Sequence, residues 1–367
     1  MMSALGLLTA CGSDARSGVG DPATSIPEAA PEGVVCEPGQ IDGDLNTYTP
    51  AGYIDPELIT QFEAEYGVEV VEDFYDSADT LLAKLQSGAT YDLIVPSDRM
   101  VAIMIENGFL AELQKEALPN LTNLDPFFAD PAYDPGGEHS VPYLWGTTGL
   151  GVDLEAVGES FPPSWGLIFD PELAAQYSGG VSLLDDERQA MGAALKYLGY
   201  SLNSTNEDQL LEAADLIATV KDRIVFGGGD FDETLVAGEV VVSQGDSDDF
   251  FTVFSPAEES LEHFSFVIPE EGAAVWVDNL TVPSSAEHPC SAHSFMNFLL
   301  EARNGAALAN WAHRASPNAA AEQFILPEIL ENPSIYPPEE VLGRLEVIIE
   351  TGDFESRYAE FFAIARS

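Results

Sequence analysis

Residues 273–283 of the chain read AAVWVDNLTVP, an apolar strand pattern that contains one large aromatic residue and one carboxylate. Side chains alternate between the two faces of a strand, so Trp276 and Asp278 project to the same side. An indole face beside a carboxylate attracts an organic cation, because the ring quadrupole and the carboxylate both favour positive charge. The pattern is also that of a core tryptophan whose aspartate neighbour caps the next turn. The stretch predicts a strand and raises the hypothesis of a cation site.

The charge of the chain is strongly one-sided. Its 367 residues include 63 acidic and 13 basic ones, which give a formal net charge of −50. Such a field repels nucleic acid and anionic lipid headgroups and steers cations toward the protein. A solvated acidic surface, as in proteins adapted to salt, explains most of this charge without any ligand. The length predicts two domains or lobes, and we expect no nucleic-acid partner.

The N-terminal segment has features of an exported lipoprotein. Residues 8–12, LTACG, resemble a bacterial lipobox and predict lipidation of Cys11. The apolar run before Cys11 is too short to span a bilayer and has no preceding basic residue, which indicates a misplaced start site. Residues 12–43 are rich in Gly, Pro, Ala, Ser and Asp and lack a helix or strand period. We predict a signal remnant and disordered tether over residues 1–43, and a domain in the periplasmic space or at the outer face of the cytoplasmic membrane.

Two further cysteines, Cys36 and Cys290, are predicted to form a disulfide, which an exported protein accommodates. Neither has a second cysteine nearby, so a catalytic or metal role has no support in the sequence. The five histidines also lack metal-ligand spacing. We therefore expect no metal and no cofactor.

The folded chain begins with strands that alternate with helices. We expect Asp55 and Ser97 to be the N-caps of two helices and residues 77–86 to form another helix between them. The strands are predicted at residues 45–49, 68–74 and 92–95. This alternation predicts a parallel α/β sheet with right-handed crossovers. Ligands of such sheets lie beyond the carboxyl ends of the strands. The rule selects the loops at residues 49–53 and 97–99.

A second α/β set follows a strand at residues 140–152, which we expect to cross between two lobes. Its strands and helices are predicted at residues 181–184, 189–198, 208–219, 239–243 and 250–257. The chain returns through residues 273–283 and 292–312 and ends in helices over 338–365. We predict a first lobe of residues 44–146 and 277–316, and a second lobe of residues 147–276 and 317–367.

Several segments occur in the order of a known family. They are YDLIVPS at 91–97, VPYLWGTT at 141–148, LLDDER at 183–188, LGY at 198–200, WVD at 276–278, VP at 282–283 and SPN at 316–318. The chain resembles the periplasmic solute-binding proteins of ABC importers, and within them the polyamine (spermidine/putrescine) receptor family. The resemblance implies a type II two-lobe α/β fold, a ligand cleft between the lobes, closure about a hinge, and a monomer that presents its ligand to a membrane permease.

The resemblance also implies a set of ligand residues. The family positions match Tyr53, Ser97, Asp186, Trp276 and Asp278. In these receptors the tryptophan stacks on the aliphatic charged chain and the carboxylates bind its ammonium groups. Because Asp186 stands at the start of a predicted helix, it is equally expected to cap that helix.

The chain departs from the family at other cleft positions. The loop at 49–53, TPAGY, lacks the family's stacking tryptophan, and Gln189 replaces a second cleft glutamate. Arg99 and Asp246 stand where an aromatic residue is usual, and Arg314 falls near a family tyrosine. In one reading, Arg99 and Arg314 pair with Asp98, Asp246 or Asp186 and reshape a polyamine site. In another, both arginines face the ligand, which is then a zwitterion that carries a carboxylate or phosphonate beside its amine.

Two other classes of protein compete with a receptor. Adjacent carboxylates, such as those at 185–186 and 248–249, are compatible with a hydrolase, but the sequence has no nucleophile elbow, zinc spacing or phosphate loop. A scaffold that kept the fold and lost its ligand is compatible with the missing tryptophan. We predict a non-enzymatic, polyamine-binding component of an ABC transporter.

Overall fold

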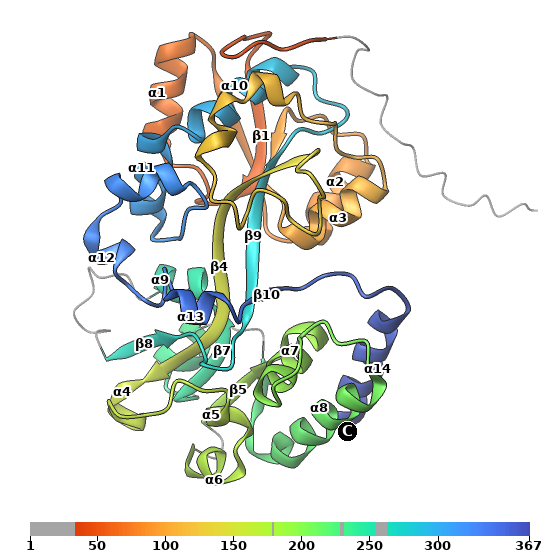
Figure 1. Cartoon of the computed structure of the whole chain (residues 1–367), viewed down its shortest axis with the longest axis vertical. Coiled ribbons are helices and arrows are strands. Elements are labelled where there is room, and N and C mark those ends of the chain that lie inside the picture. Colours follow the sequence, from red (N-terminus) through yellow and green to blue (C-terminus); the bar gives the residue numbers. More distant parts are fainter. Residues whose placement is uncertain (1–33, 178–179, 228–230, 254–262) are drawn as a thin grey trace, which may run out of the picture.

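The computed structural model describes residues 34–177, 180–227, 231–253 and 263–367. Two lobes stand one above the other and are joined by two long strands, β4 (Ser140–Asp153) and β9 (Ala274–Thr281) (Figure 1). These strands are antiparallel neighbours, and β4 continues into the lower lobe, where it pairs with β7 and β8. The predicted crossing strand is thus β4, and β9 accompanies it.

The upper lobe contains a mixed sheet with helices on both sides. Its first strands, β1 (Leu45–Pro50), β2 (Val70–Tyr75) and β3 (Leu93–Ile94), are parallel, as predicted, and β9 joins them antiparallel. The helices of this lobe are α1 (Pro56–Tyr66), α2 (Ala78–Gln86), α3 (Asp98–Glu106), α10 (Pro289–Leu299) and α11 (Ala302–Ala312). Figure 1 shows α1 and α11 on one side of the sheet and α2 and α3 on the other. A separate apolar core fills each side of the sheet, so the lobe has three layers.

Local sequence signals set the ends of these helices. Asp55 accepts a hydrogen bond from the Glu57 N–H at the start of α1, where Pro56 lacks an N–H to satisfy, and Gly67 ends the helix with a φ of 71°. Ser77, predicted as the first residue of its helix, is instead the N-cap of α2 and accepts a hydrogen bond from the Thr80 N–H. Ser97 occupies the N-cap position of α3, but its side chain makes no capping hydrogen bond.

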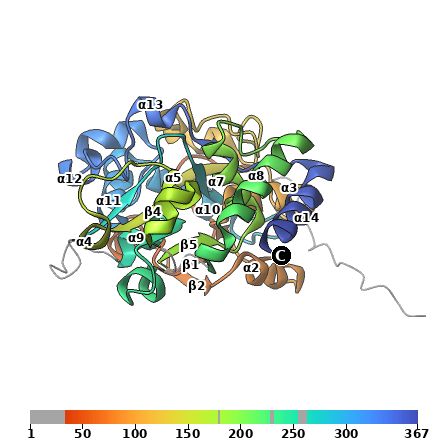
Figure 2. The same ribbon diagram turned by 90° about the horizontal axis from the view of Figure 1, so that it is seen from below.

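The lower lobe is built on β5 (Val181–Leu184), which is parallel to β6 (Val225–Gly227) and β7 (Val242–Asp246); β8 (Phe264–Val267) pairs with β4. Three helices, α7 (Glu187–Tyr197), α8 (Glu207–Val220) and α14 (Glu355–Arg366), pack against one another and lie together on one side of the molecule (Figure 2). The shorter helices are α4 (Leu154–Val157), α5 (Gly166–Phe169), α6 (Pro171–Ala174), α9 (Ser247–Val253), α12 (Pro327–Leu330) and α13 (Glu339–Leu342). Residues 254–257 of the helix predicted at 250–257 lie outside the described residues.

The C-terminal region departs from its prediction as a series of helices. Between α13 and α14 the chain forms β10 (Glu346–Val347), which pairs parallel with β9. The β-branched run Val347-Ile348-Ile349 favours an extended backbone, and β9 supplies its hydrogen-bond partners. The prediction was wrong here because this pairing depends on a strand far away in sequence.

The start of the folded body also differs from its prediction. Cys11 and residues 1–33 lie outside the described residues. Residues 34–43 of the predicted tether are held against α10, where Cys36 forms a disulfide with Cys290 and Asp42 accepts a hydrogen bond from the Ser291 N–H at 2.9 Å. Within the described ranges, no helix is long and apolar enough to cross a bilayer.

The division into lobes at residues 316 and 317 stays a prediction. The 3-10 turn η7 (Ala319–Phe324), assigned by sequence to the second lobe, packs against α11 of the first.

Candidate ligand-binding cleft

A cavity of about 280 Å³ lies between the two lobes. The upper lobe contributes the loops after β1 and β3, the lower lobe contributes the starts of α7 and α9, and β9 crosses the cavity. It is lined by Tyr53, Ser97, Asp98, Arg99, Asp186, Arg188, Gln189, Asp246, Asp248, Ala274, Val275, Trp276, Asp278 and Ile348. The structure therefore brings together all of the predicted ligand residues except Arg314.

Trp276 is positioned by a glycine on the neighbouring strand. Gly146 of β4 lies opposite Trp276 in the strand register, and a Cβ atom at Gly146 would collide with the indole ring. The indole Nε1 is buried and has no hydrogen-bond partner among the residues that the structure describes. The absence of a side chain at Gly146 thus creates the space that the indole occupies beside the cavity.

Asp278 is buried inside β9, with 7% of its surface exposed, and its backbone pairs with that of Ser97. It lies within the strand, so it is not the turn cap that the sequence left open. Burial raises the pKa of Asp278 to about 8, with a further contribution from the nearby Asp248, although Arg314 and a hydrogen bond from Tyr53 act in the opposite direction. Its Oδ2 has no partner in the described part of the chain. A cation beside Asp278 would favour its ionised form.

Two more cavity carboxyls have raised pKa values. Removal of water raises the pKa of Asp246 to about 7, and the neighbouring Asp248 adds to the effect, although Asp246 accepts a hydrogen bond of 2.6 Å from the Thr148 hydroxyl. Burial likewise raises the pKa of Asp98 to about 7, although it accepts hydrogen bonds from backbone N–H groups that include that of Arg99. The cavity thus holds several carboxyls that positive charge would stabilise as carboxylates.

Asp186 combines the two roles that its sequence position allowed. Its Oδ1 accepts hydrogen bonds of 2.9 Å from the N–H groups of Arg188 and Gln189, so it caps α7. The same side chain lines the cavity.

Arg314 lies behind the cavity wall. Its guanidinium stacks over the Tyr53 ring at 4.4 Å, and its Nη2 is 3.1 Å from the Asp248 Oδ2. Sequence reasoning named Asp98, Asp246 or Asp186 as the partner, and the partner is instead Asp248, which α9 places beside Arg314. Tyr53 therefore separates Arg314 from the cavity, and burial raises the pKa of its phenol well above the usual range.

Arg99 lines the cavity and forms an ion pair with Glu350, in which Nε and Oε1 are 3.5 Å apart. This partner also differs from the three predicted carboxylates. Glu350 lies in the segment between β10 and α14 that was predicted as helix, so no local signal indicated its place near Arg99.

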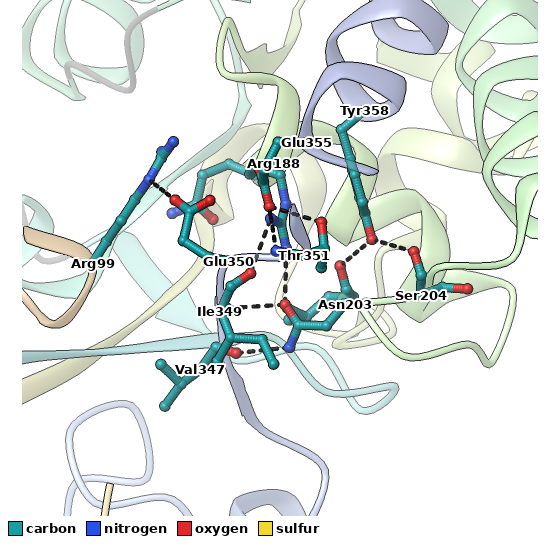
Figure 3. Close-up of polar contacts among 12 residues, drawn as sticks. Arg99, Arg188, Asn203, Ser204, Val347, Ile349, Glu350, Thr351, Glu355 and Tyr358 are labelled. Atoms are coloured by element: carbon teal, nitrogen blue, oxygen red, sulfur yellow. Dashed lines mark hydrogen bonds and ion pairs between the residues drawn. The ribbon is translucent and has the colours of Figure 1, made fainter. Parts of the chain in front are cut away.

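Arg188 is a cavity residue that sequence reasoning missed. Its side chain is buried at 2% exposure, lies over the Tyr358 ring at 4.2 Å, and contacts Glu355 and Asn203 (Figure 3). These contacts use Nη1 and Nη2 of its guanidinium, whereas the buried Nε has no hydrogen-bond partner among the described residues. In the part of the chain that the structure describes, no group of His, Cys, Asp and Glu has the arrangement of a metal site.

Comparison with known proteins agrees with this architecture. The family model described as bacterial extracellular solute-binding protein matches residues 57–337. A putrescine/cadaverine-binding protein of Pseudomonas aeruginosa is 34% identical over 312 residues, which cover 83% of this chain and 88% of that protein. A putrescine-binding periplasmic protein of Escherichia coli is 35% identical over 314 residues, which cover 82% of this chain and 85% of that protein.

Solved structures share the fold. A spermidine/putrescine ABC transporter substrate-binding protein from Streptococcus pneumoniae superimposes with a TM-score of 0.82 at 28% identity and covers 89% of this chain and 100% of that one. The two-lobe fold predicted from the sequence is thereby confirmed. The chain belongs to the bacterial extracellular solute-binding protein family.

Proposed function

We propose that this protein is the extracytoplasmic substrate-binding component of an ABC importer and that its ligand is a polyamine of the putrescine and spermidine class. The observation that carries the proposal is the buried, unpaired Oδ2 of Asp278 beside the indole of Trp276 in the cavity between the lobes. An ammonium group is a compact donor with no acceptor, so it suits such a carboxylate. The relatives named for putrescine and spermidine binding support the same ligand class.

The cavity offers complementary surfaces for the two parts of a polyamine. The face of Trp276 suits both the methylene chain and an adjacent positive charge. Asp278 and Asp246 offer carboxylates for the ammonium groups, and ligand charge offsets the unfavourable burial of these carboxylates. The ligand positions we propose are Tyr53, Ser97, Arg99, Asp186, Asp246, Trp276 and Asp278, with Arg314 acting indirectly by supporting Tyr53 and neutralising Asp248.

A zwitterionic ligand is the second candidate, because Arg99 lines the cavity and its side chain is about half exposed. That candidate also required Arg314 at the ligand, and Arg314 is instead stacked behind Tyr53. The geometry therefore favours the polyamine.

Membership of the family supports a proposal about the wider biological setting. We propose a monomer that acts without catalysis, is exported and lipid-anchored through Cys11, and delivers its ligand to an ABC permease. Ligand-dependent compaction in solution X-ray scattering distinguishes this receptor from a scaffold that has lost its ligand, since a scaffold stays unchanged.

Isothermal titration calorimetry tests the ligand. We expect binding of at least one of putrescine, cadaverine, spermidine and spermine at micromolar concentration, and a loss of at least about tenfold in affinity for Trp276→Ala, because the stacking surface is removed. Absence of heat with all four amines, together with binding of an amino acid or amino phosphonate, would replace the polyamine by the zwitterion.

A further inference from the structure

One side of the cavity is formed by a segment that comes from the C-terminal end of the chain. We call residues 346–355 the C-terminal strap; it comprises β10, the turn η8 (Gly352–Phe354) and the first residue of α14. Figure 1 shows the chain running from β10 along the top of the lower lobe to α14. Ile348 of the strap lines the cavity. A bound ligand is therefore confined by the strap on this side.

The strap is fixed to the lower lobe by hydrogen bonds on both sides of Ile348. The Asn203 side chain donates to the Val347 carbonyl at 2.8 Å and accepts from the Ile349 N–H at 3.1 Å. Arg188 Nη1 donates to the Ile349 carbonyl at 3.1 Å (Figure 3). Because Arg188 and Asn203 hold the backbone up to Ile349, the position from which the next side chain projects is also set.

That next residue, Glu350, reaches toward the upper lobe. Its carboxylate lies 3.5 Å from Arg99 Nε, near the start of α3, and the two side chains are 44% and 47% exposed. Figure 3 shows the Arg99 side chain directed toward Glu350. An ion pair this exposed contributes little to stability. Its main effect is to hold a guanidinium in place at the solvent edge of the cavity.

Most carboxylates that line the cavity already have partners. Asp186 accepts N–H groups at the start of α7, and Asp98 accepts the Arg99 N–H at the start of α3. Asp248 is paired with Arg314. These three groups offer less attraction for an incoming ammonium than an uncompensated carboxylate does.

Two cavity carboxyls have neither a backbone N–H donor nor an ion pair among the described residues. Asp278 has an orphaned, buried Oδ2, and Asp246 accepts a hydrogen bond only from the neutral Thr148 hydroxyl. The interior of the cavity is thus matched to two positive charges, and the edge beside the strap already carries one of its own on Arg99.

We propose that Arg99, held by Glu350 of the C-terminal strap, is a specificity-determining residue that restricts the ligand to a short aliphatic diamine. Asp278 and Asp246 receive the two ammonium groups. A longer triamine extending toward the strap places its third ammonium near the Arg99 guanidinium, and the like charges repel. This inference rests on the proposed function.

The test compares the dissociation constants of putrescine, a diamine, and spermidine, a triamine, by calorimetry on the whole protein. We expect the wild type to prefer putrescine. Arg99→Gln removes the repulsion and frees Glu350 to accept an ammonium, so the ratio of the spermidine to the putrescine constant falls by about tenfold or more. The matched control Arg99→Lys retains the charge and keeps the ratio within about twofold. Glu350→Gln leaves the arginine uncompensated and raises the ratio.

Two results overturn the inference while leaving the polyamine receptor intact: a wild type that prefers spermidine, or an unchanged ratio in a folded Arg99→Gln protein. If the wild type binds no polyamine, the proposed function fails, and this inference fails with it. Because Arg99 is half exposed and its side chain has one ion pair within the described ranges, we expect the melting temperatures of all three variants to stay close to that of the wild type. Binding measured on folded variants therefore reports the ligand contact.

Discussion

Replacement of Asp278 by asparagine is predicted to stabilise the ligand-free protein while abolishing polyamine binding. The carboxyl lies inside β9 at 7% exposure and has an unpaired Oδ2. Ionisation of such a group is unfavourable until a cation arrives. Asparagine has a similar shape and no charge, so it removes this cost together with the attraction for ammonium. The Asp278 carboxyl thus increases the affinity for the ligand and lowers the stability of the ligand-free protein.

The size of the effect follows from the pKa. Burial raises the pKa of Asp278 from 3.8 to about 8, a rise of roughly four pH units. Each pH unit corresponds to about 1.4 kcal/mol. The folded state binds this proton more tightly than the unfolded state, so the free energy of unfolding falls as the pH rises through both values. The wild type loses up to ~5–6 kcal/mol from this group between about pH 4 and pH 8, and the asparagine variant loses none of it.

Urea denaturation at pH 5 and pH 8.5, at one fixed salt concentration, measures the difference. We expect the stability advantage of Asp278→Asn over the wild type to be several kcal/mol larger at pH 8.5 than at pH 5. Asp186→Asn is the matched control, because Asp186 is only partly buried and asparagine also caps helices well. Saturating putrescine should raise the stability of the wild type and of the control, and leave Asp278→Asn unchanged.

A variant that is no more stable than the wild type at pH 8.5 would refute this reasoning. It would mean that a positive charge within the protein, such as that of Arg314, already compensates the Asp278 carboxylate. The cation site would then have to be placed elsewhere in the cavity.

Three further predictions follow from the same structure. Polyamine affinity should rise from pH 6 to pH 8, because the amines stay charged while Asp278 and Asp246, with pKa values of about 8 and 7, lose their protons. Equal heats of binding at pH 7 in phosphate and Tris buffers would show that binding releases no protons, and this result would contradict the prediction. Gly146→Ala should displace the Trp276 indole, weaken ligand binding by at least about tenfold and shift the tryptophan fluorescence. Unaltered affinity and fluorescence would mean that the ring can move aside without leaving the ligand site. Joint replacement of Cys36 and Cys290 by serine should lower the free energy of unfolding by about 2–5 kcal/mol without changing the ligand affinity, and a changed affinity would link the disulfide to the cleft.

Local sequence signals were sufficient to predict several helices and strands and to single out the central strand, β9. Asp55 with Pro56 and Gly67 marks the two ends of α1, because capping and positive φ depend on neighbouring residues alone. The side-chain alternation of a strand places Trp276 and Asp278 on one face before any partner is known. The alternation of strands and helices, with the family-ordered segments, was sufficient for the two-lobe α/β fold.

The charge partners and the shape of the cavity depend on how distant segments pack in the folded chain. Asp248 rather than Asp246 pairs with Arg314, and Glu350 rather than Asp98 pairs with Arg99. An ion pair depends on which distant segments lie close together in the folded chain, and the local sequence pattern does not indicate this. The pairing of β10 with β9 is of the same kind, since the strand partner supplies the hydrogen bonds that override a helical prediction. The sequence thus predicted a cation site on β9, whereas the ion pair between Glu350 of the C-terminal strap and Arg99 of α3 became visible only in the folded chain.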